Sequence, residues 1–133
     1  MECIFCKIVA GEIPSYKIYE DDKVLAFLDI NPITDGHTLL IPKEHFQMMA
    51  DTPDELVSYL FVRAKELMKV IKETMKADYV SLSVVGVDVP HFHIHFVPRN
   101  FNDGLTGFWP TKKYQEGEAE KIVKQLTIDT IDS

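Results

Sequence analysis

The sequence predicts an α+β fold with a mostly antiparallel five-stranded sheet, one long helix and a short N-terminal helix. Short apolar or alternating segments come in pairs joined by tight turns, which is typical of antiparallel hairpins. One long amphipathic pattern, with apolar residues three and four apart, indicates the long helix. We expect a single domain over the 133 residues, with a core at about 3–99 and a C-terminal segment at 100–133 whose tail is frayed.

Local signals place the elements along the chain. Gly11 and Pro14 end a short helix predicted at 3–10. Val24 to Leu28 is apolar at every position, so we expect both faces of that strand to be covered. Phe108-Trp109-Pro110 offers an apolar anchor in the C-terminal segment. The predicted strands are 16–20, 23–30, 37–41, 79–85 and a strand that starts at His91 and ends at Pro98, and a last helix is predicted at 116–126.

The long helix is predicted over 51–77. Thr52 is the expected N-cap, Pro53 suits the first helical position, and Glu55 completes a capping box. Seven apolar residues of this segment recur at spacings of three and four and therefore share one side, which predicts core packing. They are Leu56, Leu60, Ala64, Leu67, Met68, Ile71 and Met75.

Composition narrows the class of function. The chain is 46% hydrophobic and 26% charged, as in ordinary globular proteins. Its net charge of −7 argues against binding to nucleic acid or to an anionic membrane, because phosphate surfaces attract basic patches. Binding of a small nucleotide remains compatible with this net charge. No run approaches ~20 apolar residues, and the N-terminus lacks the pattern of a signal peptide. We therefore expect a cytoplasmic protein with reduced thiols.

Three of the five histidines alternate with apolar residues in the stretch 91–96. Side chains alternate between the two faces of a strand, so His91, His93 and His95 are expected on one face and their apolar neighbours on the other. Pro98 cannot donate to a β-ladder and is expected to end the strand.

This histidine row admits three interpretations. A half-exposed strand could carry the histidines by chance, although strict alternation argues against it. A shared metal site is disfavoured, because His91 and His95 would stand roughly 13 Å apart along a strand and zinc–nitrogen bonds measure about 2.0–2.1 Å. Alternatively, one imidazole acts as a nucleophile and the others orient it, since histidine is largely neutral near pH 7 and can attack phosphorus.

The row resembles the signature of the histidine triad (HIT) superfamily of nucleotide hydrolases and transferases. A second block is similar to the other well-defined HIT motif: Phe27-Leu28-Asp29-Ile30-Asn31-Pro32, then Asp35-Gly36-His37-Thr38-Leu39-Leu40-Ile41-Pro42-Lys43-Glu44-His45. The start, Cys3-Ile4-Phe5-Cys6-Lys7-Ile8 with Gly11-Glu12-Ile13-Pro14, resembles that of bacterial-type members. The resemblance covers about Cys3 to Arg99 and implies the HIT fold.

The resemblance also implies a mechanism. His93 matches the nucleophile that attacks the α-phosphorus of a nucleotide, and water then hydrolyses the nucleotidyl-histidine. His95 and His37 match histidines that hydrogen-bond around the phosphate and orient the nucleophile. No catalytic cofactor is implied.

Substrate contacts follow from the same resemblance. Asp29 matches the residue that holds the ribose hydroxyls, and a carboxylate can accept from both. Phe27 and Ile30 lie where the family packs the base, although Phe27 is equally compatible with simple core packing.

The two cysteines, Cys3 and Cys6, form a Cys-x-x-Cys pair. In a reducing compartment such a pair indicates metal or redox chemistry. Some HIT relatives hold structural zinc with this pair and two histidines, so the resemblance implies the set Cys3, Cys6, His45 and His91, a closed Cys₂His₂ site. The alternatives are two reduced cysteines without metal, or a redox pair. The redox pair is disfavoured because these cysteines do not lie in a βαβ unit.

One segment departs from the family pattern. HIT enzymes often carry Gly-Gln-Ser/Thr-Val before the triad, where this chain has Gly86-Val87-Asp88-Val89-Pro90. Val87 offers no hydrogen bond in place of the glutamine. Asp88 replaces the hydroxyl near the leaving group; it would repel phosphate when ionised and could donate a proton when neutral, or it simply caps the turn and faces solvent.

The sequence thus predicts a homodimeric HIT hydrolase that cleaves at the α-phosphorus of purine nucleoside 5′-monophosphate derivatives, with phosphoramidates and adenylylated amines as the first choice of substrate. A dinucleoside polyphosphate hydrolase is one alternative. A zinc-stabilised nucleotide-binding or interaction module without turnover is another. The expected partners are a purine nucleotide or its conjugate and a second copy of the chain, with the long helix as a candidate interface.

Overall fold

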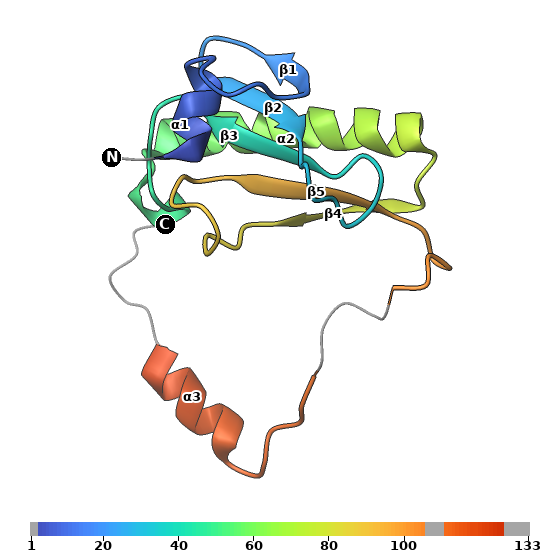
Figure 1. The fold of residues 1–133 in the computed structure, drawn as a ribbon. Helices are drawn as coiled ribbons and strands as arrows, with labels where there is room; N and C mark the ends of the chain where they lie inside the picture. Colours follow the sequence, from blue (N-terminus) through green and yellow to red (C-terminus); the bar gives the residue numbers. More distant parts are fainter. Residues whose placement is uncertain (1–2, 106–110, 127–133) are drawn as a thin grey trace. The chain divides into compact units, whose positions relative to one another are not determined.

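Five strands form one antiparallel sheet in the order β1-β2-β3-β5-β4 (Figure 1). The computed structural model describes residues 3–105 and 111–126. The predicted α+β class is confirmed, as are the antiparallel pairings of β1 with β2 and of β4 with β5. The strands are β1 (Lys17–Glu20), β2 (Val24–Leu28), β3 (Thr38–Pro42), β4 (Tyr79–Ser83) and β5 (Ile94–Arg99).

Helices cover both faces of this sheet, α1 (Ile4–Val9) on one and α2 (Asp54–Met75) on the other (Figure 1). In β2, Val24 and Ala26 belong to the core beneath α2, whereas Leu25 and Phe27 belong to the core beneath α1. Because alternate residues of a strand point to opposite faces, the uninterrupted apolar run of β2 is explained by burial on both sides, as predicted.

The start of α2 differs from the prediction. A 3₁₀ turn occupies Met49–Asp51, and the helix begins at Asp54. The predicted capping box is wrong, because the Thr52 hydroxyl donates to the Met48 carbonyl (2.9 Å) and no side chain caps the helix. The apolar stripe is confirmed except at Met75, which is 38% exposed. Its buried or packed members are Leu56, Leu60, Ala64, Leu67, Met68 and Ile71.

The histidine strand also starts later than predicted, at Ile94 rather than His91. Ahead of it Pro90 has no N–H, and the amide of Phe92 donates to the Phe46 carbonyl (2.7 Å) instead of to a neighbouring strand. The predicted alternation nevertheless holds. Phe92, Ile94 and Phe96 pack in the core beneath α2, whereas the rings of His91 and His93 contact Phe5 of α1.

Pro98 does not end this strand, which continues to Arg99. Within a strand the N–H and C=O of one residue point to the same side. The Pro98 carbonyl accepts from the Thr34 hydroxyl (2.7 Å), so its missing N–H faces the loop before β3. The pairing of β3 with β5 stops at Thr38, the first residue of β3, which lies opposite Phe96. The strand therefore loses no ladder hydrogen bond at Pro98.

The chain forms two compact units, residues 1–103 and 104–133. The second unit contains α3 (Glu118–Leu126), close to the predicted last helix. The proposed anchor Phe108-Trp109-Pro110 and the frayed tail lie outside the described residues, and the single-domain boundary stays a prediction. No helix in the described part of the chain is long and apolar enough to cross a membrane.

Candidate active site and metal site

A pocket of about 360 Å³ lies on the sheet face that α1 covers. Its wall combines α1, the segment before β1, the end of β2 with the loop after it, one residue of β3, the turn before the histidine row, and the start of β5. The structure brings together here six of the seven residues predicted to act on a substrate; the seventh, His37, lies behind His95. The six are Phe27, Asp29, Ile30, Asp88, His93 and His95.

His93 has one ring nitrogen fixed by the backbone. Its Nδ1 lies 2.6 Å from the His91 carbonyl. A carbonyl only accepts, so Nδ1 carries the proton and donates. The ring is 3% exposed and meets Phe5 edge to face, with centroids 5.1 Å apart. In this tautomer Nε2 keeps its lone pair, which is what a nucleophilic imidazole requires.

His37 and His95 are joined by a hydrogen bond of 3.0 Å between His37 Nε2 and His95 Nδ1. The Ile33 amide donates to His37 Nδ1 (3.1 Å). His37 Nδ1 is therefore an acceptor, and His37 Nε2–H is the donor to His95. In neutral His95 the proton then resides on Nε2.

Burial keeps both of these rings neutral. Desolvation lowers the pKa of His37, with the Asp29 carboxylate opposing. Desolvation also lowers the pKa of His95, helped by His93 and His37 and opposed by Asp29 and Asp88. A histidine whose pKa lies below its ordinary value near 6.5 is unprotonated at neutral pH. Neutral rings preserve the directional hydrogen bond between them.

The end of β2 forms the side of the pocket that contains the residues predicted to contact the nucleoside. The Asn31 amide donates to Asp29 Oδ1 (2.9 Å), and Asp29 Oδ2 lies 3.6 Å from His37 Nε2. Phe27 is 3% exposed and packs against Phe5, with centroids 5.5 Å apart, so it is both a core residue and part of the pocket wall. Ile30 is 77% exposed, and its apolar surface is available to a ligand.

Asp88 lies on the exposed turn between β4 and β5. The structure places it in the pocket wall beside Val89, and its charge acts to raise the pKa of His95. The preceding residue, Val87, is 79% exposed and is not part of the wall.

Four ligand atoms converge at the other end of the histidine row, all within 4.8 Å of one another: the Sγ atoms of Cys3 and Cys6 and the Nδ1 atoms of His45 and His91. His91 Nδ1 lies 3.4 Å from Cys3 Sγ and 3.5 Å from Cys6 Sγ. His45 Nδ1 lies 3.2 Å from His91 Nδ1 and from Cys6 Sγ. Ligands of a tetrahedral zinc stand roughly 3.3–3.8 Å apart, from bonds of about 2.0–2.3 Å, so the set has the dimensions of a metal site.

The surroundings of this cluster also suit a metal. His91 Nε2 donates to the Pro42 carbonyl (2.8 Å), which leaves Nδ1 as the acceptor that faces the cysteines. Metal-bound histidines usually donate their second nitrogen in this way. Burial, followed by the hydrogen bond with Cys3, raises the pKa of Cys6 to about 11. A metal binds the thiolate and would displace that proton.

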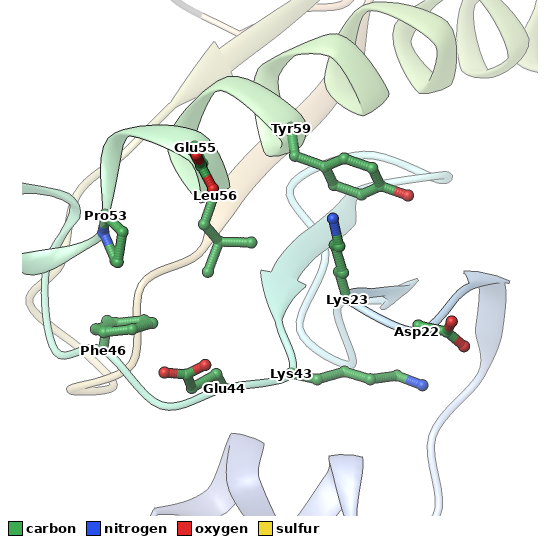
Figure 2. Close-up of a pocket in the computed structure, with 9 residues that line it drawn as sticks. All are labelled: Asp22, Lys23, Lys43, Glu44, Phe46, Pro53, Glu55, Leu56 and Tyr59. Atoms are coloured by element: carbon green, nitrogen blue, oxygen red, sulfur yellow. The ribbon is translucent and has the colours of Figure 1, made fainter.

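A second pocket of about 290 Å³ lies near the start of α2 (Figure 2). Phe46, Pro53 and Leu56 form its apolar side. Facing them, the Lys23 ammonium lies 4.8 Å from the centre of the Tyr59 ring. None of the residues predicted for catalysis, substrate or metal lines this pocket. The candidate active site is therefore the pocket that contains His93.

Residues 10–102 match the family model of the HIT domain. The chain belongs to the HIT family. The adenosine 5′-monophosphoramidase of Saccharomyces cerevisiae is 38% identical over 126 residues, which cover 93% of this chain and 80% of the yeast protein. A HIT family member from Bacillus subtilis shares the fold over the full length of both chains, with a TM-score of 0.85 and 35% identity.

A Zn-bound histidine triad family protein from Mycobacterium smegmatis is also similar to this HIT chain. The TM-score is 0.74 at 38% identity, and the match covers 80% of this chain and 81% of that one. These likenesses confirm the predicted HIT fold and are compatible with metal binding by the four-residue cluster.

Sequence reasoning missed two parts of the site. Ile4, Phe5 and Ile8 of α1 line the pocket, but a helix of six residues is too short for its apolar spacing to indicate a ligand. The His91 carbonyl fixes the tautomer of His93. Every residue has a backbone carbonyl, so the residue types could not predict this contact. The resemblance of the N-terminal motif is the one signal that could have drawn α1 into the site.

Proposed function

We propose that this HIT protein hydrolyses purine nucleoside 5′-monophosphate derivatives at the α-phosphorus, with His93 as the nucleophile. Phosphoramidates and adenylylated amines are the proposed substrates, in keeping with the named activity of the yeast relative. The observation that carries the proposal is the bond from His93 Nδ1 to the His91 carbonyl, because it leaves Nε2 unprotonated on a ring that lines a pocket of about 360 Å³.

The reaction takes place in two displacements. His93 Nε2 attacks phosphorus, the phosphorus–nitrogen bond breaks with its electron pair on nitrogen, and that nitrogen takes up a proton to leave as an amine. Water then attacks the phosphorus, loses a proton, and breaks the bond to Nε2. The nucleoside monophosphate leaves and the imidazole is restored. The protein needs no redox partner or second substrate besides water.

The other residues position the substrate. We assign His95, held by His37, to hydrogen bonding with the phosphoryl oxygens, where a neutral N–H donor is effective. Asp29 accepts from the ribose hydroxyls, and Phe27 with Ile30 contacts the base. Their shared location in one pocket supports these roles.

We also propose that Cys3, Cys6, His45 and His91 hold a structural zinc. All four sites are filled by protein ligands, as in structural rather than catalytic zinc sites, and the ion would attach α1 to the segment before β5. Free cysteines of this kind fit a reducing, cytoplasmic setting.

A homodimer is the proposed assembly. Phe61 and Met75 are 37% and 38% exposed on α2, and β4 is an edge strand whose outer side has no partner in the described sheet. Exposed apolar side chains and an unpaired strand edge favour association with a second copy.

The proposal is tested by steady-state assays of the wild type and His93→Ala on an adenosine phosphoramidate and on a diadenosine polyphosphate. We expect the wild type to hydrolyse the phosphoramidate faster. His93→Ala should lose at least about a thousandfold in kcat, as nucleophile removal does elsewhere, while its thermal melt and its binding of adenosine monophosphate persist. Binding without hydrolysis of either compound by the wild type would instead favour a binding module.

A further inference from the structure

The charges around the candidate active site are unusual for a protein proposed to act on phosphates. Among the described residues that line the pocket there are two carboxylates, Asp29 and Asp88, and no lysine or arginine. An anionic leaving group would find no positively charged side chain in this pocket. A cationic leaving group would be attracted by a carboxylate.

The two carboxylates are not equivalent. Asp29 accepts a hydrogen bond from the Asn31 amide (2.9 Å) and lies 3.6 Å from His37 Nε2. Asp88 makes no hydrogen bond or salt bridge with any described residue, and it is exposed at the pocket wall. Its charge reaches His95 and acts to raise the pKa of that ring. Asp88 is thus available to a part of the ligand other than the ribose, which is assigned to Asp29.

Its position indicates which part of the ligand it faces. The nucleoside is assigned to the end of β2, at Phe27, Asp29 and Ile30, and the phosphorus to His93. Of the other polar residues in the wall, Asn31 closely follows Asp29, and Ser15 precedes Tyr16, whose carbonyl accepts from the Leu28 amide, so both belong to the nucleoside side at the end of β2. Asp88, next to Val89, lies on the separate turn before the histidine row. The group released from phosphorus therefore departs past Asp88.

We propose that Asp88 determines leaving-group specificity, favouring amines that carry a second positive charge and disfavouring anionic leaving groups. The inference rests on the proposed function. Asp88 takes no part in bond making or breaking, since the leaving nitrogen takes up its proton from water. It acts through the field of an ionised carboxylate at a solvent-exposed site, where unit charges a few ångströms apart change a rate several-fold.

The test uses three adenosine 5′-phosphoramidates whose alkyl amines have equal length and end in an ammonium, a methyl or a carboxylate group. The values of kcat/KM are measured for the wild type, Asp88→Asn and Asp22→Asn. Asp22→Asn is the matched control, because it removes the same charge from an exposed turn that lines the other pocket (Figure 2).

We expect the wild type to prefer the ammonium substrate, with a smaller preference at higher salt because of screening. Asp88→Asn should reduce the ammonium-to-carboxylate ratio of kcat/KM by about tenfold, and Asp22→Asn should leave it unchanged. The methyl substrate shows in each variant that the site still works.

An unchanged ratio in Asp88→Asn, with hydrolysis of the methyl substrate intact, would overturn this inference alone. The proposed function would then stand. Failure of the wild type to hydrolyse any of the three compounds would overturn both.

Discussion

Two backbone carbonyls hold different ring nitrogens of neighbouring histidines in one row, which suits the different roles proposed for them. The Pro42 carbonyl holds Nε2 of His91 and leaves Nδ1 for the cysteine cluster. The His91 carbonyl holds Nδ1 of His93 and leaves Nε2 for the pocket. Neutral imidazole has one donor and one acceptor nitrogen, so the choice of anchored nitrogen decides which nitrogen is free to react.

The lowered pKa values of His37 and His95 predict a specific pH profile for the proposed phosphoramidase reaction. In the proposed mechanism both rings act unprotonated, so kcat/KM should be level from neutral pH down to about 6.5 and should fall only at lower pH, as the rings take up protons. The measurement is initial rate against pH, corrected for spontaneous hydrolysis. Circular dichroism at each pH serves as the control for unfolding. A decline that is complete above pH 7 would contradict the assignment.

One observed hydrogen-bond network and one proposed metal ion connect elements around the sheet. In the network, Asp21 connects the β1–β2 hairpin to α2, because its Oδ2 accepts from the hydroxyls of Tyr19 (2.7 Å) and Tyr59 (2.5 Å). Burial alone would raise the pKa of Asp21, but these bonds and those from the amides of Lys23 and Val24 outweigh it and hold the pKa well below its usual range.

Asp21→Asn should therefore lower the free energy of unfolding by about 1–3 kcal/mol, the value of hydrogen bonds to a charged group. A depressed carboxyl pKa contributes stability that is complete above the unfolded value near 4 and is lost as pH falls through the folded pKa. The gap between wild type and variant in urea melts should thus be widest at neutral pH and shrink below pH ~4. Asp22→Asn is the control; an equal loss there would contradict the role of Asp21.

The second connection is the proposed zinc, which would join α1 to the segment around His91. Protein purified without chelator should contain one zinc per chain, and Cys6→Ser should abolish it. Metal binding is linked to folding, so a strong chelator should lower the melting temperature of the wild type but not that of Cys6→Ser. Absence of zinc from the wild type by elemental analysis would refute this assignment.

The whole molecule is expected to pair with a second copy through the exposed apolar side of α2. Light scattering after size exclusion should give twice the 15.3 kDa of one chain. Phe61→Lys should shift the mass towards a monomer, because it places a charge among apolar side chains. Lys69→Glu, on the polar side of α2, is the control. A wild-type monomer at micromolar concentration would contradict the proposed assembly.

The sequence supplied the fold because the signals that carry it are local. The apolar run of β2, the stripe of α2 and the alternation after His91 all reflect burial of residues that lie a few positions apart in the sequence. Element ends were less predictable, since Thr52 had a nearby carbonyl to satisfy and Phe92 donated to the distant Phe46. A long-range hydrogen bond such as that from Phe92 to Phe46 has no pattern in the sequence.

The sequence predicted which residues lie together in the candidate site, but not the directions of their hydrogen bonds. The resemblance to HIT motifs named the residues of both clusters, and the structure brings each set together. The tautomers of His91 and His93 depend on the carbonyls of Pro42 and His91, and the positions of these carbonyls are known only from the folded backbone. The contribution of α1 to the pocket depends likewise on the packing of Phe5 against Phe27 and His93.

The most direct test of the central claim is to capture the covalent intermediate on His93. Wild-type protein mixed with an adenosine phosphoramidate is quenched in alkali within the first turnover, digested, and mapped by mass spectrometry. We predict an adenylyl group on the peptide that contains His93, at this histidine, and none in His93→Ala. Rapid hydrolysis with no adduct, or an adduct on another residue, would contradict the account.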